Sequence, residues 1–408
     1  MNDLVRGVRR VFPSVLAAML LCSTGTWGQV RITVKNPSSS PRPNEPVVVP
    51  WTEIARAWPA VDPRALQLAD ENGAPLTLQV DDLDFDGTPD ELTFVADFGP
   101  GQERVFTAGP GKADTGGTRA LRTDAVDWKR IGGVLHSLVD DDVAGNARVR
   151  GAYRFDGVGW ESDVIAYRLY LDARNAIDIN GKRKPGLCWD YLGTSGADYQ
   201  KDAGWGMDIL QIGNALGIGG IGFWAGDSVL KPITLDRQRT RIVARGPVRA
   251  AVRVEYTGWD VGGEKENVTS LFTIYAGDRV SEQRVILEAG PSPKTLATGI
   301  VRLDSTEIAW NPGGGYLYTT GRQSRANDGL MMALNVSPGA VMKKTEDAVN
   351  HLLILKLVKG TPLKILLSAY WQGEHGTMWT GDRIREFLEA TGRRLTEPLQ
   401  VCVAGMGR

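Results

Sequence analysis

Histidine and cysteine are scarce in this chain, which holds three of each among 408 residues. His136, His351 and His375 are therefore the few side chains that titrate near neutral pH without help from their surroundings. His351 lies in the strand-like stretch NHLLILKL, where we expect it only to pack. His136 and His375 follow or flank glycines next to acidic residues, and loops of this kind commonly carry binding groups.

Excess charge and long apolar runs are also lacking. The chain has 47 basic and 48 acidic residues, a formal net charge of −1, so no basic surface for nucleic acid is expected. No segment approaches about 20 uninterrupted apolar residues, which excludes a membrane-spanning helix. A hydrophobic content of 42% is ordinary for a globular protein with more than one core.

Residues 1–28 have the layout of a secretory signal peptide. Three arginines precede the apolar run Val11 to Cys22, and small residues follow it ahead of Gln29. Leu21 stands where a lipoprotein signal needs a small residue, which disfavours a lipid anchor at Cys22. We expect secretion, with the periplasm as the location. In that oxidising compartment Cys188 and Cys402 would either pair or remain buried thiols.

The remaining chain reads as all-β. Apolar residues alternate with polar ones in QVRITVKN, ELTFVADF and VIAYRLYLD, the period-two pattern of half-buried strands. We expect a small N-terminal β domain over residues 29–115. A Gly- and Thr-rich linker then leads to a large antiparallel β sandwich over residues 116–408.

Few helices are expected. One short candidate lies around Ile54 to Trp58. A second lies near the C-terminus, where Ile384 and Leu388 fall at helical spacing and Gly392 is a candidate helix end.

Acidic residues crowd the stretch DDLDFDGTPDEL. Asp82, Asp84, Asp86 and Asp90 occupy loop positions one, three, five and nine, with a glycine at position six. This spacing wraps oxygens around a hard cation, and we expect a structural Ca²⁺ there. Thr93 replaces the glutamate of a helical calcium hand, so the expected loop belongs to a β hairpin. The alternative is an Asp/Gly-rich turn without an ion.

The stretch GIGGIG places Gly217, Gly219 and Gly222 at dinucleotide-binding spacing. No helix follows in FWAGDSVLKP, so no helix N-terminus is available for a pyrophosphate. We expect a glycine-rich strand or turn and no nucleotide cofactor.

Aromatic residues provide the remaining signal, with 12 tryptophans and 10 tyrosines, many beside glycines and acids. Sugar rings stack on aromatic planes while charged side chains bind their hydroxyls. The alternative is that the tryptophans form the core and the charges pair locally. The predicted saccharide-binding set is Trp160, Glu161, Arg168, Asp190, Tyr199, Trp205 and Asp208, with Trp371 and Glu374 from a second loop.

Several long motifs resemble an exported bacterial family, domain of unknown function 4861. They are NEPVVVPW, QVDDLDFDGTPDELTF, WESDVIAYRLYLDARNAIDINGK, GWGMDILQIGNALGIGG and YWQGEHG, and together they span nearly the whole mature chain. The resemblance implies a role in the utilisation of uronate-containing polysaccharides. It also implies a supersandwich similar to galactose-mutarotase-like proteins and polysaccharide lyases. A histidine often follows the family's tyrosine before Trp-Gly-Met-Asp; here Gln200 follows Tyr199, which would leave that role to Tyr199 or His375.

The first functional hypothesis is a periplasmic enzyme acting on an acidic oligo- or polysaccharide. For β-elimination, Arg168 would neutralise the uronate, and Tyr199 with His136 or His375 would supply base and acid. For hydrolysis, Glu161 and Asp208 are the carboxylate pair. The other hypotheses are a non-catalytic glycan-binding protein and, by fold analogy alone, a sugar epimerase.

Overall fold

The computed structural model describes residues 28–111, 120–145, 151–192, 198–289, 294–304, 306–374 and 376–406. The predicted signal peptide lies outside these residues apart from Gly28, and His375 lies outside them too. Secretion and the role of His375 therefore stay predictions. Within the described residues, no helix is long and apolar enough to cross a membrane.

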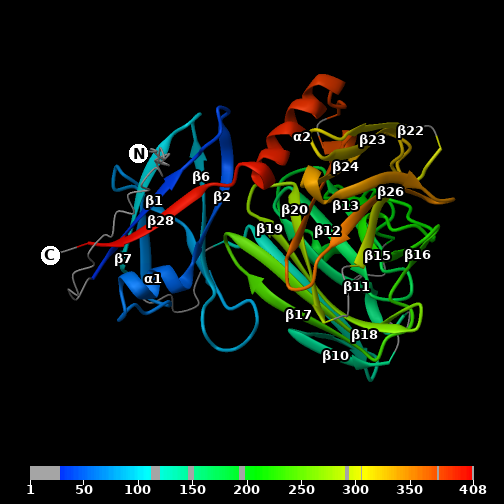
Figure 1. The fold of residues 1–408 in the computed structure, drawn as a ribbon, viewed down its shortest axis with the longest axis horizontal. Coiled ribbons are helices and arrows are strands. Elements are labelled where there is room, and N and C mark those ends of the chain that lie inside the picture. Colours follow the sequence, from blue (N-terminus) through cyan, green and yellow to red (C-terminus); the bar gives the residue numbers. More distant parts are fainter. Residues whose placement is uncertain are drawn as a thin grey trace, which may run out of the picture.

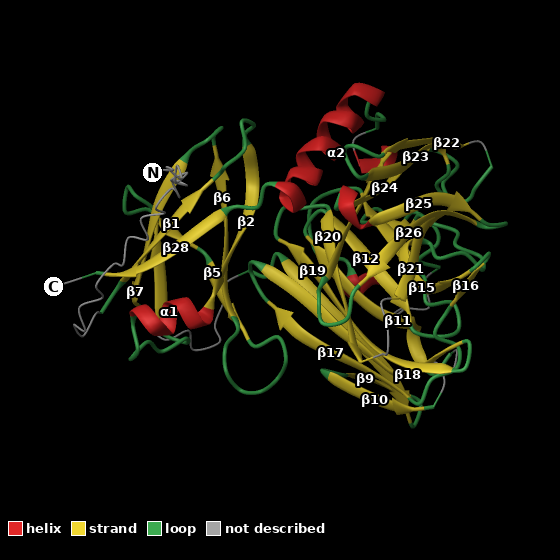
Figure 2. Cartoon of the chain, viewed as in Figure 1, coloured by secondary structure: helices red, strands yellow, loops and turns green. Residues whose placement is uncertain are grey.

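The described chain is built from antiparallel sheets, which confirms the all-β fold (Figures 1 and 2). A smaller body holds the N-terminal strands, and a larger body holds the rest except the final strand. Among the described residues there are two α-helices, α1 in the smaller body and α2 in the larger one (Figure 2).

The small domain pairs a five-stranded sheet with a three-stranded one. Val30, Ile32 and Val34 are fully buried between them, as their alternation predicts. In spatial order, the first sheet is β28 (Gln400–Gly405), β1 (Val30–Lys35), β7 (Glu103–Pro110), β3 (Leu66–Ala69) and β4 (Pro75–Leu76). The second is β2 (Arg42–Pro50), β6 (Glu91–Phe98) and β5 (Leu78–Asp81), with helix α1 (Trp51–Ala57) following β2.

The last strand of the chain belongs to the small domain. β28 pairs with β1 along its whole length, from Val30 opposite Gly405 to Lys35 opposite Gln400. The predicted division at residue 115 therefore needs a correction, because residues 400–405 lie in the N-terminal sheet. The alternating pattern of a strand shows its faces but not its partner.

The large domain consists of three sheets around one apolar core. The nine-stranded sheet is β10 (Asp140–Ala144), β17 (Arg237–Arg245), β18 (Arg249–Val261), β19 (Glu264–Tyr275), β20 (Val280–Ala289), β27 (Leu363–Trp371), β24 (Gly329–Val336), β23 (Tyr316–Arg322) and β22 (Thr306–Asn311). The six-stranded sheet is β14 (Gly206–Asp208), β13 (Ile177–Lys182), β12 (Ile165–Tyr170), β11 (Tyr153–Ser162), β8 (Thr123–Ile131) and β9 (Val134–Ser137). The five-stranded sheet is β16 (Ser228–Leu230), β15 (Ile218–Ala225), β21 (Lys294–Val301), β26 (Asn350–Leu357) and β25 (Val341–Glu346).

Short 3₁₀ turns mark three of the connections in the large domain: η1 (Trp189–Tyr191), η2 (Pro338–Ala340) and η3 (Gln372–Glu374). Residues 218–222 of the GIGGIG stretch lie in strand β15, as expected for a glycine-rich strand, and Gly217 directly precedes it. A Cβ on Gly217 would lie only 1.8 Å from the carbonyl oxygen of Ile177, and φ there is +69°. Gly217 is therefore required by close packing and by its backbone conformation.

Helix α2 (Gly381–Thr396) covers part of the nine-stranded sheet at the junction of the two bodies (Figure 1). Ile384 and Leu388 are buried in its packed face, as predicted. Gly392 does not end the helix, contrary to expectation. A Cβ there would lie 3.2 Å from the carbonyl oxygen of Gly314, so this glycine permits close packing and does not cap.

Charged groups join the two domains. Arg394 at the end of α2 is bonded to Glu45 of the small domain and, at 2.6 Å, to Asp278 of the large one. Arg249 of β18 bonds Asp81 and Glu91 of the small domain, and its side chain is 2% exposed. These buried pairs hold the two sheet systems against each other.

Candidate functional site

A polar face on the six-stranded sheet carries most of the candidate residues. In β12, Tyr167 and Leu169 point into the core, so Arg168 and Tyr170 lie on the opposite face, although Tyr170 also packs against this core cluster. In β13, Ile177 and Ile179 point into the core, so Asp178, Asn180 and Lys182 share the outward face. We call this surface the outer face; the loops around Trp189, Tyr199 and Arg325 cover it.

Arg168 is the centre of the outer face. Its Nη2 contacts the carboxylate of Asp178 and the phenol of Tyr170, and lies 3.4 Å from Asp208 Oδ2. Its Nη1 donates to the Tyr199 phenol oxygen at 3.4 Å. The strand register places Asp178 directly opposite Arg168. The Arg168 side chain is only 1% exposed, and a buried charge needs nearby charges of opposite sign. Asp178 and Asp208 supply them.

Asp208 is the member of this group that titrates near neutral pH. Burial and the neighbouring Asp178 raise its pKa to about 7, against the opposing effect of Arg168 and Arg325. Arg325 reaches it from the loop between β23 and β24, with Nη2 3.7 Å from Asp208 Oδ1. Arg325 is also the more accessible of the two guanidiniums, with a side chain 24% exposed.

Tyr199 is the half-buried phenol at the rim of this group. Its carbonyl accepts the Asp208 amide at 2.9 Å, which ties the loop of one residue to the strand of the other. The structure therefore brings together three predicted site residues: Arg168, Tyr199 and Asp208.

Aromatic rings surround the same face. Trp205 stacks on Tyr191, with ring centroids 6.2 Å apart and planes at 10°, and Tyr191 is 56% exposed. Phe155 lies in a β-bulge of β11, where Phe155 and Asp156 adopt left-handed φ of 46° and 57°. Such backbone costs free energy and clusters at functional sites. The bulge places the Phe155 ring 5.9 Å from the Arg168 guanidinium.

Glu161 lies on the outer face, but its carboxylate is bonded to the turn η1 that covers this face. Its carboxylate contacts Lys182 Nζ and accepts the backbone amides of Cys188 and Trp189. Burial raises its pKa. Because it is fully buried and saturated with donors, Glu161 fixes η1 above the sheet.

The two cysteines among the described residues are both free. Cys188 is buried beside η1, where burial raises the pKa of its thiol. Cys402 is exposed on β28 of the small domain. The alternative of a disulfide between them is not formed, since one is buried in the large domain and the other faces solvent on the small one.

Two predicted tryptophans are core residues. Trp160 is fully buried, stacks on Phe272 and donates to Ser281 Oγ at 2.9 Å. Trp371 is also fully buried and donates to Asp328 Oδ1 at 2.7 Å. Neither ring offers a free plane to a sugar.

The remaining candidates lie around the site rather than in it. Glu374 in η3 pairs with Arg279 at 3.1 Å, and its side chain is 5% exposed. Asp190 is an exposed residue of η1. Burial lowers the pKa of Arg154 to about 10, and the negative charge of Asp190 opposes that shift. His136 is exposed on the edge strand β9, opposite Lys129.

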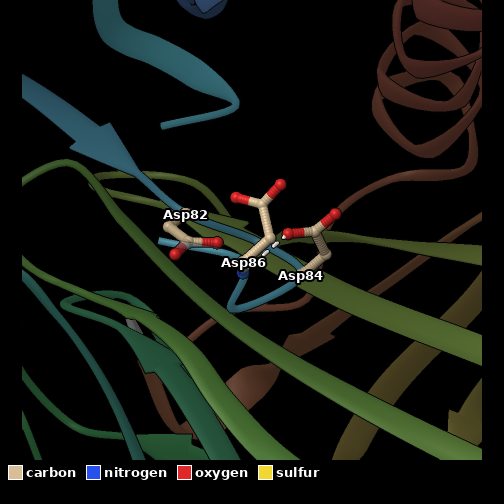
Figure 3. A group of neighbouring side chains, drawn as sticks. All are labelled: Asp82, Asp84 and Asp86. Carbon is tan, nitrogen blue, oxygen red and sulfur yellow. Dashed lines mark hydrogen bonds between the residues drawn. The ribbon is translucent and has the colours of Figure 1, made fainter. Parts of the chain in front are cut away.

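The Asp-rich loop joins β5 to β6 and lies against the large domain. Leu83 is buried among Val243, Ala244, Ala251 and Leu271 of the nine-stranded sheet. Asp82, Asp84 and Asp86 each have a carboxylate oxygen within 4.8 Å of those of the other two. Figure 3 shows the three side chains close together on the loop. Three clustered carboxylates are a donor set that suits Ca²⁺. Asp90 instead accepts the Leu83 amide at 2.6 Å, outside this group.

The carboxylates also hold the loop without an ion. Asp82 accepts the amides of Phe85 and Gly87, and Asp86 accepts that of Thr88. The calcium site stays a prediction, while Leu83 of the same loop packs against the nine-stranded sheet.

Several residues at the outer face escaped the sequence prediction, among them Asp178, Asn180, Lys182, Arg154 and Arg325. Asp178 and Asn180 had a signal, because they alternate with isoleucines in AIDINGK. Arg154 and Arg325 had none, since they reach the site through a bulge and a loop from other parts of the chain.

These features define an all-β protein of two domains, with a buried cluster of arginine, aspartate and tyrosine on one sheet face. The chain belongs to the family described as Domain of unknown function (DUF4861), which it matches over residues 34–401. No curated protein matches it.

Among solved structures, the chain is similar to a glycosyl hydrolase family 38 protein and to an alpha-mannosidase, the first from Enterococcus faecalis and the second from its strain V583. Both are 9% identical with a TM-score of 0.46, and each alignment covers 93% of this chain. The chain spans 48% and 46% of the length of those two proteins. The likeness to a galactose-mutarotase-like supersandwich stays a prediction.

Proposed function

We propose that this protein is a carbohydrate-active enzyme that cleaves an acidic saccharide at the outer face of the six-stranded sheet. The observation that carries the proposal is the convergence of Tyr199 and Asp208 on Arg168. A carboxyl group with a pKa of about 7 beside a phenol is suited to proton transfer near neutral pH.

In β-elimination each residue of the cluster would have one role. Asp208, once deprotonated, takes the proton from the carbon next to the substrate carboxylate, and the electron pair forms a double bond as the glycosidic oxygen leaves. Tyr199 donates its proton to that oxygen. Arg168 donates to the Tyr199 oxygen, which leaves the phenolic hydrogen free to point toward the substrate.

The neutralising cation in this scheme is Arg325, not Arg168. The charge of Arg168 is already balanced by Asp178 and Asp208. Arg325 is the more open guanidinium at the same carboxylate. An arginine also suits a substrate carboxylate because its planar fork binds both oxygens.

Hydrolysis is the rival chemistry, because two carboxyl groups, Asp178 and Asp208, converge on one nitrogen of Arg168. Glu161 does not serve as the second carboxylate in this proposal, since Lys182 and two backbone amides occupy it. The stacked Tyr191 and Trp205 rings would hold a sugar ring in either chemistry. Export through the predicted signal peptide would bring the site to external polysaccharide.

Incubation of the mature chain with uronate-containing polysaccharides and oligosaccharides tests the proposal. An unsaturated ultraviolet absorbance marks elimination, and products heavier by one water mark hydrolysis. We expect Tyr199→Phe and Asp208→Asn each to lower kcat by about 10²-fold or more. His136→Ala is the matched control, because its side chain is exposed on an edge strand, and we expect it to change kcat less than twofold. If the protein is retained on a glycan but forms no product, the proposal of an enzyme fails and a glycan-binding protein takes its place.

A further inference from the structure

Asn180 is a fully buried amide in the middle of the outer face. Neither its Nδ2 nor its Oδ1 has a hydrogen-bond partner among the described residues. A buried polar group left unpaired costs about 1–3 kcal/mol, so native proteins rarely keep one without a reason. An apolar side chain of the same size would fill this position of a β-strand without that cost.

The strand register fixes what surrounds this amide. Asn180 lies directly opposite Asp208 on β14 and opposite Ala166 on β12. Asp178 precedes it by two residues on the same face. The orphaned amide is thus next to both carboxyl groups of the proposed site.

We propose that Asn180 is a substrate-contacting residue that binds hydroxyl groups of the saccharide next to Asp208. This inference rests on the proposed function. The amide offers a donor at Nδ2 and an acceptor at Oδ1, which match two neighbouring sugar hydroxyls.

Local charge favours a neutral hydroxyl over the substrate carboxylate at this position. Asp178 and Asp208 would repel an anion, while an amide oxygen accepts no bond from an ionised carboxylate. The substrate carboxylate belongs at Arg325, which approaches Asp208 Oδ1 to 3.7 Å. Asn180 and Arg325 would then fix the sugar from two sides and set which hydroxyl pattern is accepted.

Two variants test this role, Asn180→Leu and Asn180→Ala, measured on oligosaccharides of galacturonate, glucuronate and mannuronate. We expect Asn180→Leu to raise KM, and Kd in calorimetry, at least tenfold on the substrate that the wild type prefers. We also expect its melting temperature in the absence of sugar to equal or exceed that of the wild type, because an unpaired amide has been removed. An internal structural amide would instead show a lowered melting temperature and an unchanged KM.

Thr298→Val is the matched control. Thr298 is fully buried in β21 with an unpaired Oγ1, but β21 lies in the five-stranded sheet. We expect no change in KM or Kd from this variant.

The outcomes separate the two proposals. If the wild type acts on the oligosaccharides and both Asn180 variants stay within twofold of it, the amide holds only water, and the Asn180 role is overturned while the proposed function stands. If the wild type neither binds nor cleaves any of the three oligosaccharides, both proposals fail together. A tenfold loss restricted to the Asn180 variants supports the assignment.

Discussion

Arg249 of β18 and Asp81 of β5 form a buried ion pair across the domain boundary, with Nη2 2.6 Å from Oδ2. Glu91 of β6 contacts the same guanidinium. Arg249→Met would leave the buried Asp81 carboxylate and the half-buried Glu91 carboxylate without this cation. We expect it to lower the free energy of unfolding by about 3–5 kcal/mol, measured by urea denaturation.

The comparison for that variant is Arg237→Met. Arg237 pairs with Asp142, but its side chain is 58% exposed. Exposed pairs contribute about 0–1 kcal/mol, so this variant should unfold close to the wild type. Equal losses in both variants would contradict a special role for the domain-boundary pair.

The Asp208 carboxyl should make stability depend on pH. Its folded-state pKa of about 7 lies above its ordinary value of 3.8, so the folded protein binds this proton more tightly than the unfolded chain. The resulting stabilisation is fully present below about pH 4 and is lost as the pH rises through about 7. We expect the wild-type melting temperature to fall between pH 5 and pH 8 more steeply than that of Asp208→Asn.

Asp227→Asn, at an exposed turn residue, should follow the wild-type curve. Parallel curves for the wild type and Asp208→Asn would show that Asp208 does not titrate in this range. The same ionisation predicts that elimination speeds up as the pH rises through about 7, since Asp208 must lose its proton to act as the base.

Calcium should stabilise the Asp-rich loop if the three carboxylates bind it. Saturation at about 100 times Kd would stabilise the folded protein by about 2.7 kcal/mol and raise the melting temperature. Asp84→Asn combined with Asp86→Asn should abolish the effect, while Asp82 is left in place because it accepts two loop amides. Identical melting temperatures in calcium and in a chelator would favour the ion-free turn.

Variants of Tyr191 and Trp160 should affect different properties, glycan binding in the first case and folding stability in the second. Tyr191→Ala removes a ring that is 56% exposed, so stability should hardly change while glycan binding weakens by about 0.5–1.5 kcal/mol. Trp160→Ala empties a fully buried position and should cost about 3–5 kcal/mol of unfolding free energy. Calorimetric titration and urea denaturation of both variants test this; an unchanged Kd for Tyr191→Ala would remove Tyr191 from the site.

The sequence predicted which side chains share one face of a strand, but it did not predict which residues of neighbouring strands lie opposite each other. Alternation in VIAYRLYLD correctly puts Tyr167 and Leu169 on one face and Arg168 and Tyr170 on the other, because strand geometry fixes that choice locally. The prediction of a half-buried strand was wrong, since all six residues of β12 are buried. The same pattern could not show that Asp178 lies opposite Arg168, since register depends on the neighbouring strand.

The tryptophans illustrate the other limit. The local sequence around a tryptophan, with glycine and acid beside it, does not show how far its ring is buried. Trp160 is fully buried in the core, whereas Trp205 is 9% exposed and stacks on the exposed Tyr191. Arg325 joins the cluster from more than 100 residues away through a loop, and no local periodicity reports such a contact.

The pairing of β28 with β1 joins the two ends of the described chain in one sheet. The small domain cannot complete its five-stranded sheet until residues 400–405 have left the ribosome, although all of its other strands are made first. Contacts of such large sequence separation slow folding, because a long loop must close before they form. The predicted signal peptide implies that the chain crosses a membrane before it folds. In that case β1 and β28 would both be present on the same side of the membrane before the small domain folds.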